Sequence, residues 1–285
     1  MQEYTTISEL LELAKQAGGL PQAVLEHYIS EGANKKEAIK RMRENLSVMR
    51  ASIQEGLNPD AKSMSGRVGG QSAKLMKSLL NGESFGGKPI GLASAYALAA
   101  AECNACMGRI VAAPTAGACG VLPAALFAAQ DEKGYTDDDL VRALFVAAGV
   151  GRVIALRASI SGAEGGCQAE VGSASAMAAA ALAYLGGADP ETCMRAAGFA
   201  IMNLMGLVCD PVEGLVEVPC VYRNVVGVSC AVTSANLAIS GIPLIMSVDE
   251  IIEAMRRVGR SLPASLRETG EGGCAACKLC EEAKK

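Results

Sequence analysis

Apolar residues recur every three or four positions between residues 34 and 56, and charged residues fill most of the remaining positions. This spacing predicts one helix with a single apolar face, because residues three and four apart lie on the same side of an α-helix. Asn34 supplies the N-cap and Gly56 the end of this helix. The apolar face comprises Ile39, Met42, Leu46, Met49 and Ile53.

Two further helices are predicted before this one. Residues 6–9 read Thr-x-x-Glu, a capping box, and the glycine pair at 18–19 marks the end of the first helix. Pro21 opens the second helix, which ends near Gly32. Residues 1–58 are therefore predicted to form a small helical module.

Alanine-rich segments separated by glycine or proline dominate the rest of the chain. Residues 173–185 are apolar on every face, which is typical of a helix buried among other helices. Sustained alternation of apolar and polar residues, the mark of strands, is not seen. We therefore predict an all-α fold, with a larger domain at 59–270, functional loops between its helices, and a cysteine-rich tail at 271–285. The alanine-rich segments are 92–108, 121–130, 138–158, 173–186, 190–207 and 225–240.

Composition and charge exclude several classes of protein. The net charge is −4, tryptophan is absent, and basic residues do not interleave with aromatic ones, so nucleic-acid binding is not expected. The apolar stretch 90–114 is interrupted by Glu102, Asn104 and Arg109, which argues against a membrane span. The N-terminus lacks the charge and apolar pattern of a secretory signal. A cytoplasmic protein with reduced thiols among its eleven cysteines is expected.

Three cysteines lie where glycine and proline indicate loops. Cys167 follows Gly-Ala-Glu-Gly-Gly, Cys209 precedes Asp-Pro, and Cys220 follows Val-Pro. Three thiolates can hold three irons of a cubane iron–sulfur cluster and leave the fourth iron open, an arrangement suited to catalysis. A buried cysteine can instead pack as a small apolar residue, and spacing alone leaves both interpretations open. Core packing is expected for Cys103, Cys106, Cys119, Cys193 and Cys230.

Several polar residues are candidates for binding a substrate. A glycine-rich loop around residues 63–70 offers backbone N–H groups that can hold a carboxylate. The alternative for each candidate is a satisfied structural hydrogen bond, and this alternative is favoured for Glu102. His27, the only histidine, is expected to be structural. The substrate candidates are Ser63, Ser65, Gly66, Asn104 and Thr115.

Three segments carry a resemblance to a known family. They are Ala-Pro-Thr-Ala-Gly at 113–117, Gly-Ala-Glu-Gly-Gly-Cys-Gln-Ala-Glu-Val-Gly at 162–172, and Cys-Asp-Pro-Val-Glu-Gly-Leu-Val-Glu-Val-Pro-Cys at 209–220. These segments closely resemble the iron–sulfur-dependent L-serine dehydratases, and the resemblance extends from the N-terminal helix to about residue 273. The chain is similar to the separate alpha, or catalytic, subunit of that family.

The resemblance implies a cofactor, a partner and a reaction. Cys167, Cys209 and Cys220 would hold a [4Fe–4S] cluster whose open iron acts as a Lewis acid. The reaction would convert L-serine to pyruvate and ammonia, and a beta subunit would complete the active site. Pyridoxal phosphate is not expected, because no lysine stands in a recognisable cofactor loop. The sequence does not identify the general base.

The last cysteines, Cys274, Cys277 and Cys280, form Cys-x2-Cys-x2-Cys. Three interpretations remain open. The segment can hold a second cluster, although the fourth cysteine usual for that motif is absent. It can supply a resting-state fourth ligand to the open iron, as a C-terminal cysteine does in fused family members. It can also be a tail that binds adventitious metal.

Two other functions are compatible with these residues. A related cluster lyase acting on L-threonine or L-cysteine would use the same cysteines. An iron–sulfur electron carrier or redox sensor would instead depend on the terminal cysteine motif.

Overall fold

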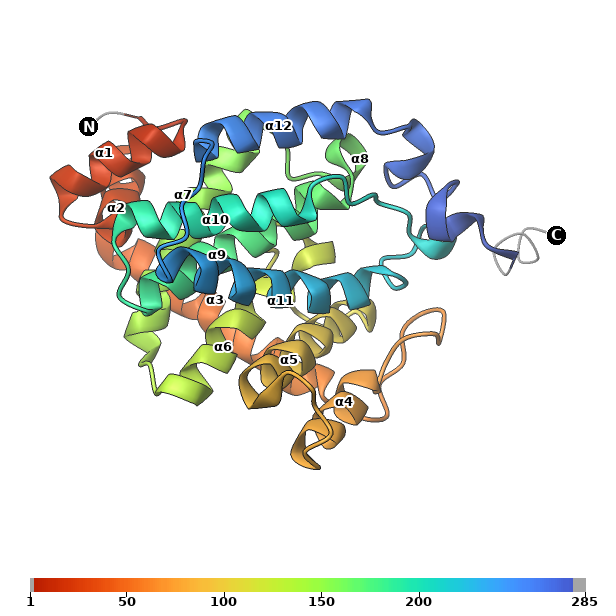
Figure 1. Cartoon of the computed structure of the whole chain (residues 1–285). Coiled ribbons are helices and arrows are strands. Elements are labelled where there is room, and N and C mark those ends of the chain that lie inside the picture. The colour runs from red at the N-terminus through yellow and green to blue at the C-terminus, as the bar shows by residue number, and fades with distance from the viewer. Residues whose placement is uncertain (1–2, 279–285) are drawn as a thin grey trace.

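The computed structural model describes residues 3–278, and within them it contains helices and no β-strand, as predicted. Figure 1 shows the helices gathered in one body, with α12 running across one side. The α-helices are α1 (Ile7–Ala17), α2 (Leu20–Ser30), α3 (Lys35–Gly56), α4 (Gln71–Leu80), α5 (Gly87–Ala105), α6 (Val121–Lys133), α7 (Asp137–Arg157), α8 (Gly162–Gly165), α9 (Ser173–Leu185), α10 (Pro190–Leu204), α11 (Cys220–Ile239) and α12 (Val248–Ser261). Short helical turns are η1 (Ala116–Ala118), the π-helical η2 (Gln168–Gly172), η3 (Val212–Gly214), η4 (Ala264–Leu266) and η5 (Gly273–Ala276).

Capping side chains fix the starts of α1 and α3 where the sequence predicts them, and α2 carries its predicted proline in the first turn. The Thr6 side chain accepts the N–H of Glu9, and the Glu9 carboxylate accepts the N–H of Thr6, which completes the capping box of α1. Gly18 ends α1 in the left-handed conformation. The Asn34 side chain accepts the first N–H groups of α3, whose apolar face is buried at Leu46, Met49 and Ile53. The boundary at residue 58 stays a prediction.

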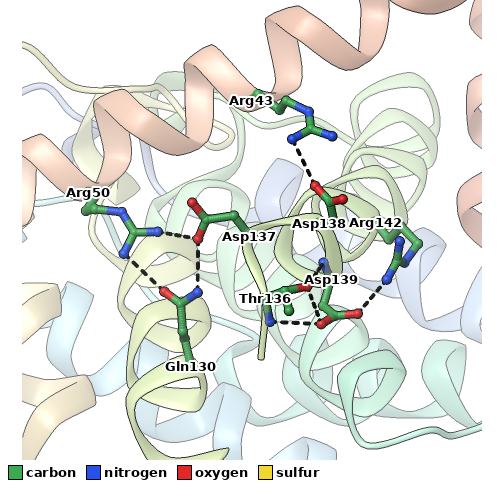
Figure 2. Close-up of polar contacts among 8 residues, drawn as sticks. All are labelled: Arg43, Arg50, Gln130, Thr136, Asp137, Asp138, Asp139 and Arg142. Atoms are coloured by element: carbon green, nitrogen blue, oxygen red, sulfur yellow. Dashed lines mark hydrogen bonds and ion pairs between the residues drawn. The ribbon is translucent and has the colours of Figure 1, made fainter. Parts of the chain in front are cut away.

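Exposed polar contacts join α3 to the start of α7 (Figure 2). Arg43 lies 2.9 Å from Asp138, and Arg50 lies 2.5 Å from Asp137 and 3.1 Å from Gln130 on α6. Each of these ion pairs is largely exposed, and such pairs contribute little to stability. They join α3 to α6 and α7 at the surface, while the buried face of α3 supplies the stabilising contact.

Helix α9 lies in the middle of the bundle. It packs against α6, α7, α10 and α11, and its alanines are buried on all sides. Small side chains allow close approach elsewhere as well. At Gly56 on α3, a Cβ atom would lie only 1.8 Å from the carbonyl oxygen of Ala99 on α5. The high alanine and glycine content therefore permits tight helix contacts.

Helix boundaries differ from the predicted ones where tertiary structure decides them. Helix α5 begins at Gly87 and ends at Ala105, earlier at both ends than predicted. Helix α4 was not predicted separately. The largest correction concerns Cys220: it was expected in a connection, but it is the first residue of α11, with Pro219 at the N-cap. Proline fits a helix start because its fixed φ and missing N–H cost nothing there.

Several of the connections between these helices lie at one end of the bundle. Figure 1 shows the segment after α10 running to the end of the molecule where α8 and the described C-terminal residues lie. The backbone of Cys209 pairs with that later segment: its N–H donates to Leu266 and its carbonyl accepts from Glu268. Within residues 3–278, no helix is both long enough and apolar enough to cross a membrane.

Candidate functional site

The three loop-associated cysteines come together at this end of the bundle. Cys167 precedes the π-helical turn, Cys209 lies in an extended segment, and Cys220 begins α11. Cys167 and Cys209 are each 4% exposed, and Cys220 is partly buried. Cys209 is close enough to both other thiols for their charges to affect its pKa. Residues from three separate segments therefore form one cluster of thiols.

The environment keeps these thiols neutral when no metal is bound. Burial, with a further contribution from the Glu170 carboxylate, raises the pKa of Cys167 and of Cys220 to about 12. Burial raises the pKa of Cys209 in the same direction. The Arg223 guanidinium opposes this rise at Cys167 and Cys220. Binding of metal cations deprotonates coordinating thiols, so the three would then act as thiolates.

Glu170 is the carboxylate that borders the thiol cluster. The Thr115 hydroxyl donates to its Oε1 at 2.8 Å, and its Oε2 lies 3.7 Å from the Cys209 sulfur. Burial raises the pKa of Glu170. The sequence analysis did not select Glu170, although an acidic residue inside the run Gln-Ala-Glu-Val-Gly was a usable signal.

A nearly buried ion pair stands beside the cysteines. Arg223 lies 2.7 Å from Asp210, and it also donates to the carbonyl oxygen of Val208 at 2.7 Å. Arg223 is one turn after Cys220 on α11, and Asp210 follows Cys209 directly. The pair therefore ties two cysteine-bearing segments together and places a positive charge near the thiols. Sequence reasoning missed both residues.

The backbone at Gly162 packs closely against the thiol cluster. At Gly162, a Cβ atom would lie 2.6 Å from Glu170 Oε2 and 3.0 Å from the sulfur of Cys209. Within residues 3–278, no three His, Cys, Asp or Glu side chains are placed to hold a single metal ion. A cubane cluster makes a different demand, because each cysteine binds a separate iron. Three thiols, two of them buried and one partly buried, and an adjacent guanidinium suit such a group.

The predicted glycine-rich loop contacts the segment between Cys209 and Cys220. Ser63 Oγ donates to Glu217 at 2.7 Å, and Ser65 donates to the same carboxylate through its hydroxyl and its backbone N–H. Gly66 adopts a positive φ, which lets the loop turn. Both serine hydroxyls thus make structural hydrogen bonds here, and their role in substrate binding stays a prediction. Glu217 was not among the predicted site residues.

An ion pair strengthens the same contact. Arg67 binds Glu213 through both guanidinium nitrogens, at 2.6 and 2.8 Å. Bidentate pairs of this kind fix geometry as well as attract. The loop carrying Ser63 and Ser65 is therefore fastened to the cysteine-bearing segment at two points.

The remaining substrate candidates are placed apart. Thr115 reaches the thiol cluster through Glu170, as described above. Asn104 is partly buried near the end of α5, and its side chain has no hydrogen-bond partner within the described part of the chain. Neighbouring Glu102 is fully buried and accepts the N–H groups of Gln71 and Ser72, at 2.9 and 3.1 Å. Glu102 therefore caps α4, the structural role expected for it.

The C-terminal cysteines begin beside the site. The backbone N–H of Cys274 donates to Asp210 at 2.6 Å, and the Cys274 side chain is exposed. Cys277 is partly buried, and Cys280 lies outside the described residues. The three interpretations of this motif stay predictions. Of the cysteines expected in the core, Cys103, Cys119 and Cys193 are buried, while Cys106 and Cys230 are partly buried.

Comparison with known proteins gives a consistent result. The family model described as serine dehydratase alpha chain matches residues 4–275. A probable L-serine dehydratase alpha chain of Bacillus subtilis is 44% identical over 285 residues, covering 99% of this chain and 94% of the relative. An L-serine dehydratase alpha chain of Peptoniphilus asaccharolyticus is 39% identical, covering 98% and 97%. L-serine dehydratase 1 of Escherichia coli is 38% identical over 87% of this chain, which spans 56% of that longer protein.

Proposed function

The chain belongs to the serine dehydratase alpha chain family, and we propose from this membership that it converts L-serine to pyruvate and ammonia. The observation that carries the proposal is the meeting of Cys167, Cys209 and Cys220 in one largely buried cluster, within a chain related to dehydratases over nearly its whole length. Loss of water from serine gives aminoacrylate, which tautomerises and hydrolyses to the two products.

We further propose that the three cysteines hold a [4Fe–4S] cluster. The meeting of the three thiols and the nearby Arg223 charge support this assignment. When bound, the cluster would supply an iron without a protein thiolate, a Lewis acid that polarises the bond to the departing hydroxyl. Pyridoxal phosphate has no part in the proposal.

The chain's own residues would position and deprotonate the substrate. Glu170 is the acidic side chain beside the cysteines, and Thr115 holds one of its oxygens in place. We assign the removal of the α-proton to Glu170, because a general base must lie within reach of the reacting carbon. The loop with Ser63 and Ser65 borders the same segment and is the proposed place for the substrate carboxylate.

A beta chain is the proposed partner. Two relatives are named alpha chains, and the longer L-serine dehydratase 1 contains sequence beyond the matched part. A separate beta subunit would supply the counterpart of that unmatched part. The proposed active form is therefore a heteromer.

Anaerobic reconstitution tests the proposal. The chain is treated with iron and sulfide, and pyruvate formation from L-serine is measured with and without a beta chain of a related dehydratase. We expect broad visible absorbance, turnover of L-serine in the mixture, and little activity from the chain alone. Parallel assays with L-threonine and L-cysteine establish the preferred substrate.

Two outcomes would contradict the proposal. A reversible redox couple without lyase activity on any of the three amino acids would indicate an electron carrier or sensor. Full activity without iron and sulfide would remove the cluster from the mechanism. Full activity of the loaded chain alone would refute only the requirement for a partner.

A further inference from the structure

A cavity lies between α8, the π-helical turn and α12, and its lining includes none of the three cysteines. Its volume is about 310 Å³, which is near the lower end for pockets that bind small molecules. Figure 1 shows α8 beneath one end of α12. The lining residues are Ala158, Ser159, Ala163, Glu164, Gly165, Gln168, Ala169, Met255, Arg256, Arg260 and Arg267.

Positive charge dominates the wall of this cavity. Arg256 and Arg260 are one turn apart on α12, so they lie on the same helix face, and Arg267 approaches from the segment that follows. The acidic residue in the lining is Glu164, which is exposed and already accepts the Ser159 hydroxyl at 2.6 Å. Three guanidinium groups therefore face one carboxylate.

Two of the three arginines have unused hydrogen-bond donors. Arg256 is paired with Glu253, at 2.7 and 2.5 Å. The Arg260 side chain makes no hydrogen bond or ion pair within residues 3–278. The Nε of Arg267 is buried and has no hydrogen-bond partner. A buried donor without an acceptor costs free energy, so this wall favours an acceptor of opposite charge.

We propose that this cavity is a second binding site, separate from the cysteine cluster, for a small oxyanion carrying two or more negative charges. Arginine suits such a ligand because its planar fork of donors matches phosphate and carboxylate groups. Phosphates and tricarboxylates share this chemistry. A monoanion leaves one guanidinium without a partner and binds more weakly.

The site is joined to two of the three cysteines. Gln168 lines the cavity and directly follows Cys167; its amide donates to the Met255 carbonyl at 3.0 Å and accepts from Gly206 at 2.8 Å. Arg267 pairs through its backbone with Cys209. A ligand held by Arg260 and Arg267 therefore restrains the segments that carry both cysteines.

Calorimetric titration of the full chain with inorganic phosphate, citrate and acetate, at constant ionic strength, tests the proposal. We expect saturable binding of phosphate or citrate, and weaker binding of acetate. Arg260→Gln and Arg267→Gln should each weaken binding about tenfold or more, the loss expected for one charge-assisted interaction. Arg41→Gln, which removes the same charge from α3, should bind normally. Comparison of phosphate with citrate identifies the preferred anion.

Thermal unfolding and a cavity-filling variant distinguish a specific loss of anion binding from misfolding of the variant. Arg260 is exposed, so Arg260→Gln should keep the unfolding temperature of the unmodified chain without anion. Ala163→Leu occupies the cavity while leaving every arginine, and it should abolish binding. Absence of saturable binding to the unmodified chain, or equal binding by the arginine variants and the control, would overturn the proposal. Water alone would then satisfy these donors. These readouts do not depend on dehydratase activity.

Discussion

At the scale of single residues, the side chains that border the thiol cluster are held in place by hydrogen bonds and ion pairs with other residues. Arg223 lies near the cysteines because Asp210 and the Val208 carbonyl hold it there. Glu170 is fixed on one side by Thr115. The proposed ligands thus stand in a prepared surrounding, with one positive and one acidic group close by.

The ligand assignment predicts a selective loss of absorbance. Serine is a poor replacement for a thiolate on iron, so replacing Cys167, Cys209 or Cys220 by Ser should remove most of the broad visible absorbance after reconstitution. Cys193→Ser is the matched control, because this buried thiol also has its pKa raised to about 12, chiefly by burial, but lies elsewhere. Full iron content in any of the three variants would exclude that residue as a ligand.

The role assigned to Glu170 predicts loss of turnover without loss of the cluster. Glu170→Gln keeps the size of the side chain and can still accept from Thr115, but it cannot take a proton. We expect kcat for serine to fall roughly 100-fold or more in the reconstituted heteromer, with iron content unchanged. Thr115→Val should have a smaller effect, because it leaves the carboxylate in place. Unchanged kcat in Glu170→Gln would assign the base to another residue.

The sequence was sufficient to select the three cysteines as site residues, but it did not identify the residues that surround them. The glycines and prolines next to Cys167, Cys209 and Cys220 are local signals, which a sequence displays directly. Asp210 and Glu217, by contrast, matter because distant segments donate to them. Such pairings depend on tertiary structure, so the spacing of residues in one sequence does not reveal them.

At the scale of helices, capping residues and glycine contacts determine where elements begin and how closely they pack. The starts of α1 and α3 were predictable because their caps lie within three residues of the helix. The start of α11 at Cys220 was not, since the chain before it is held by contacts with the loop at 63–67. All-α character was predictable from periodicity, whereas the order of packing around α9 was not.

The contact between α3 and α5 predicts a large effect of one methyl group. In Gly56→Ala, the new Cβ would overlap the backbone carbonyl of Ala99, so the two helices must separate. We expect the free energy of unfolding to fall by about 2 kcal/mol or more, as measured by urea denaturation. Gln54→Ala, on the exposed face of α3, should change it by less than about 0.5 kcal/mol. Similar stabilities for both variants would contradict this packing.

At the scale of the whole molecule, distant parts of the chain hold each other. Asp249 on α12 accepts the N–H of Ile7 at 2.7 Å and both the N–H and the hydroxyl of Ser8. A carboxylate at a helix N-terminus is stabilising because it satisfies free N–H groups and complements the helix dipole. The small N-terminal module is therefore attached to α12 as well as to α7.

Burial of the only histidine predicts a pH dependence of stability. His27 is 2% exposed, packs its ring 4.7 Å from that of Tyr4, and has its pKa lowered chiefly by burial and then by Arg152. The unfolded chain therefore binds the proton more readily than the folded chain. Stability should be complete above about pH 6.5 and should decrease as the pH falls below it.

Urea denaturation at about pH 7.5 and about pH 5.5 measures this effect. His27→Phe removes the titrating group while keeping an aromatic ring, so it should show a smaller loss of stability at the lower pH. Arg152→Gln should also reduce the loss, because it removes a positive charge that disfavours protonation of His27. An identical loss in the unmodified chain and in His27→Phe would show that other groups cause it.

Leu266 and Glu268, which pair with the backbone of Cys209, are synthesised after all three clustered cysteines. A ribosome adds all three clustered cysteines well before it reaches the residues that hold Cys209 in its extended position. Cys209 can therefore gain these backbone partners only after the segment that follows α12 has been synthesised. If the three cysteines hold the proposed cluster, iron would reach them most easily in that interval. A chain stalled before residue 266 would leave Cys209 without its backbone partners.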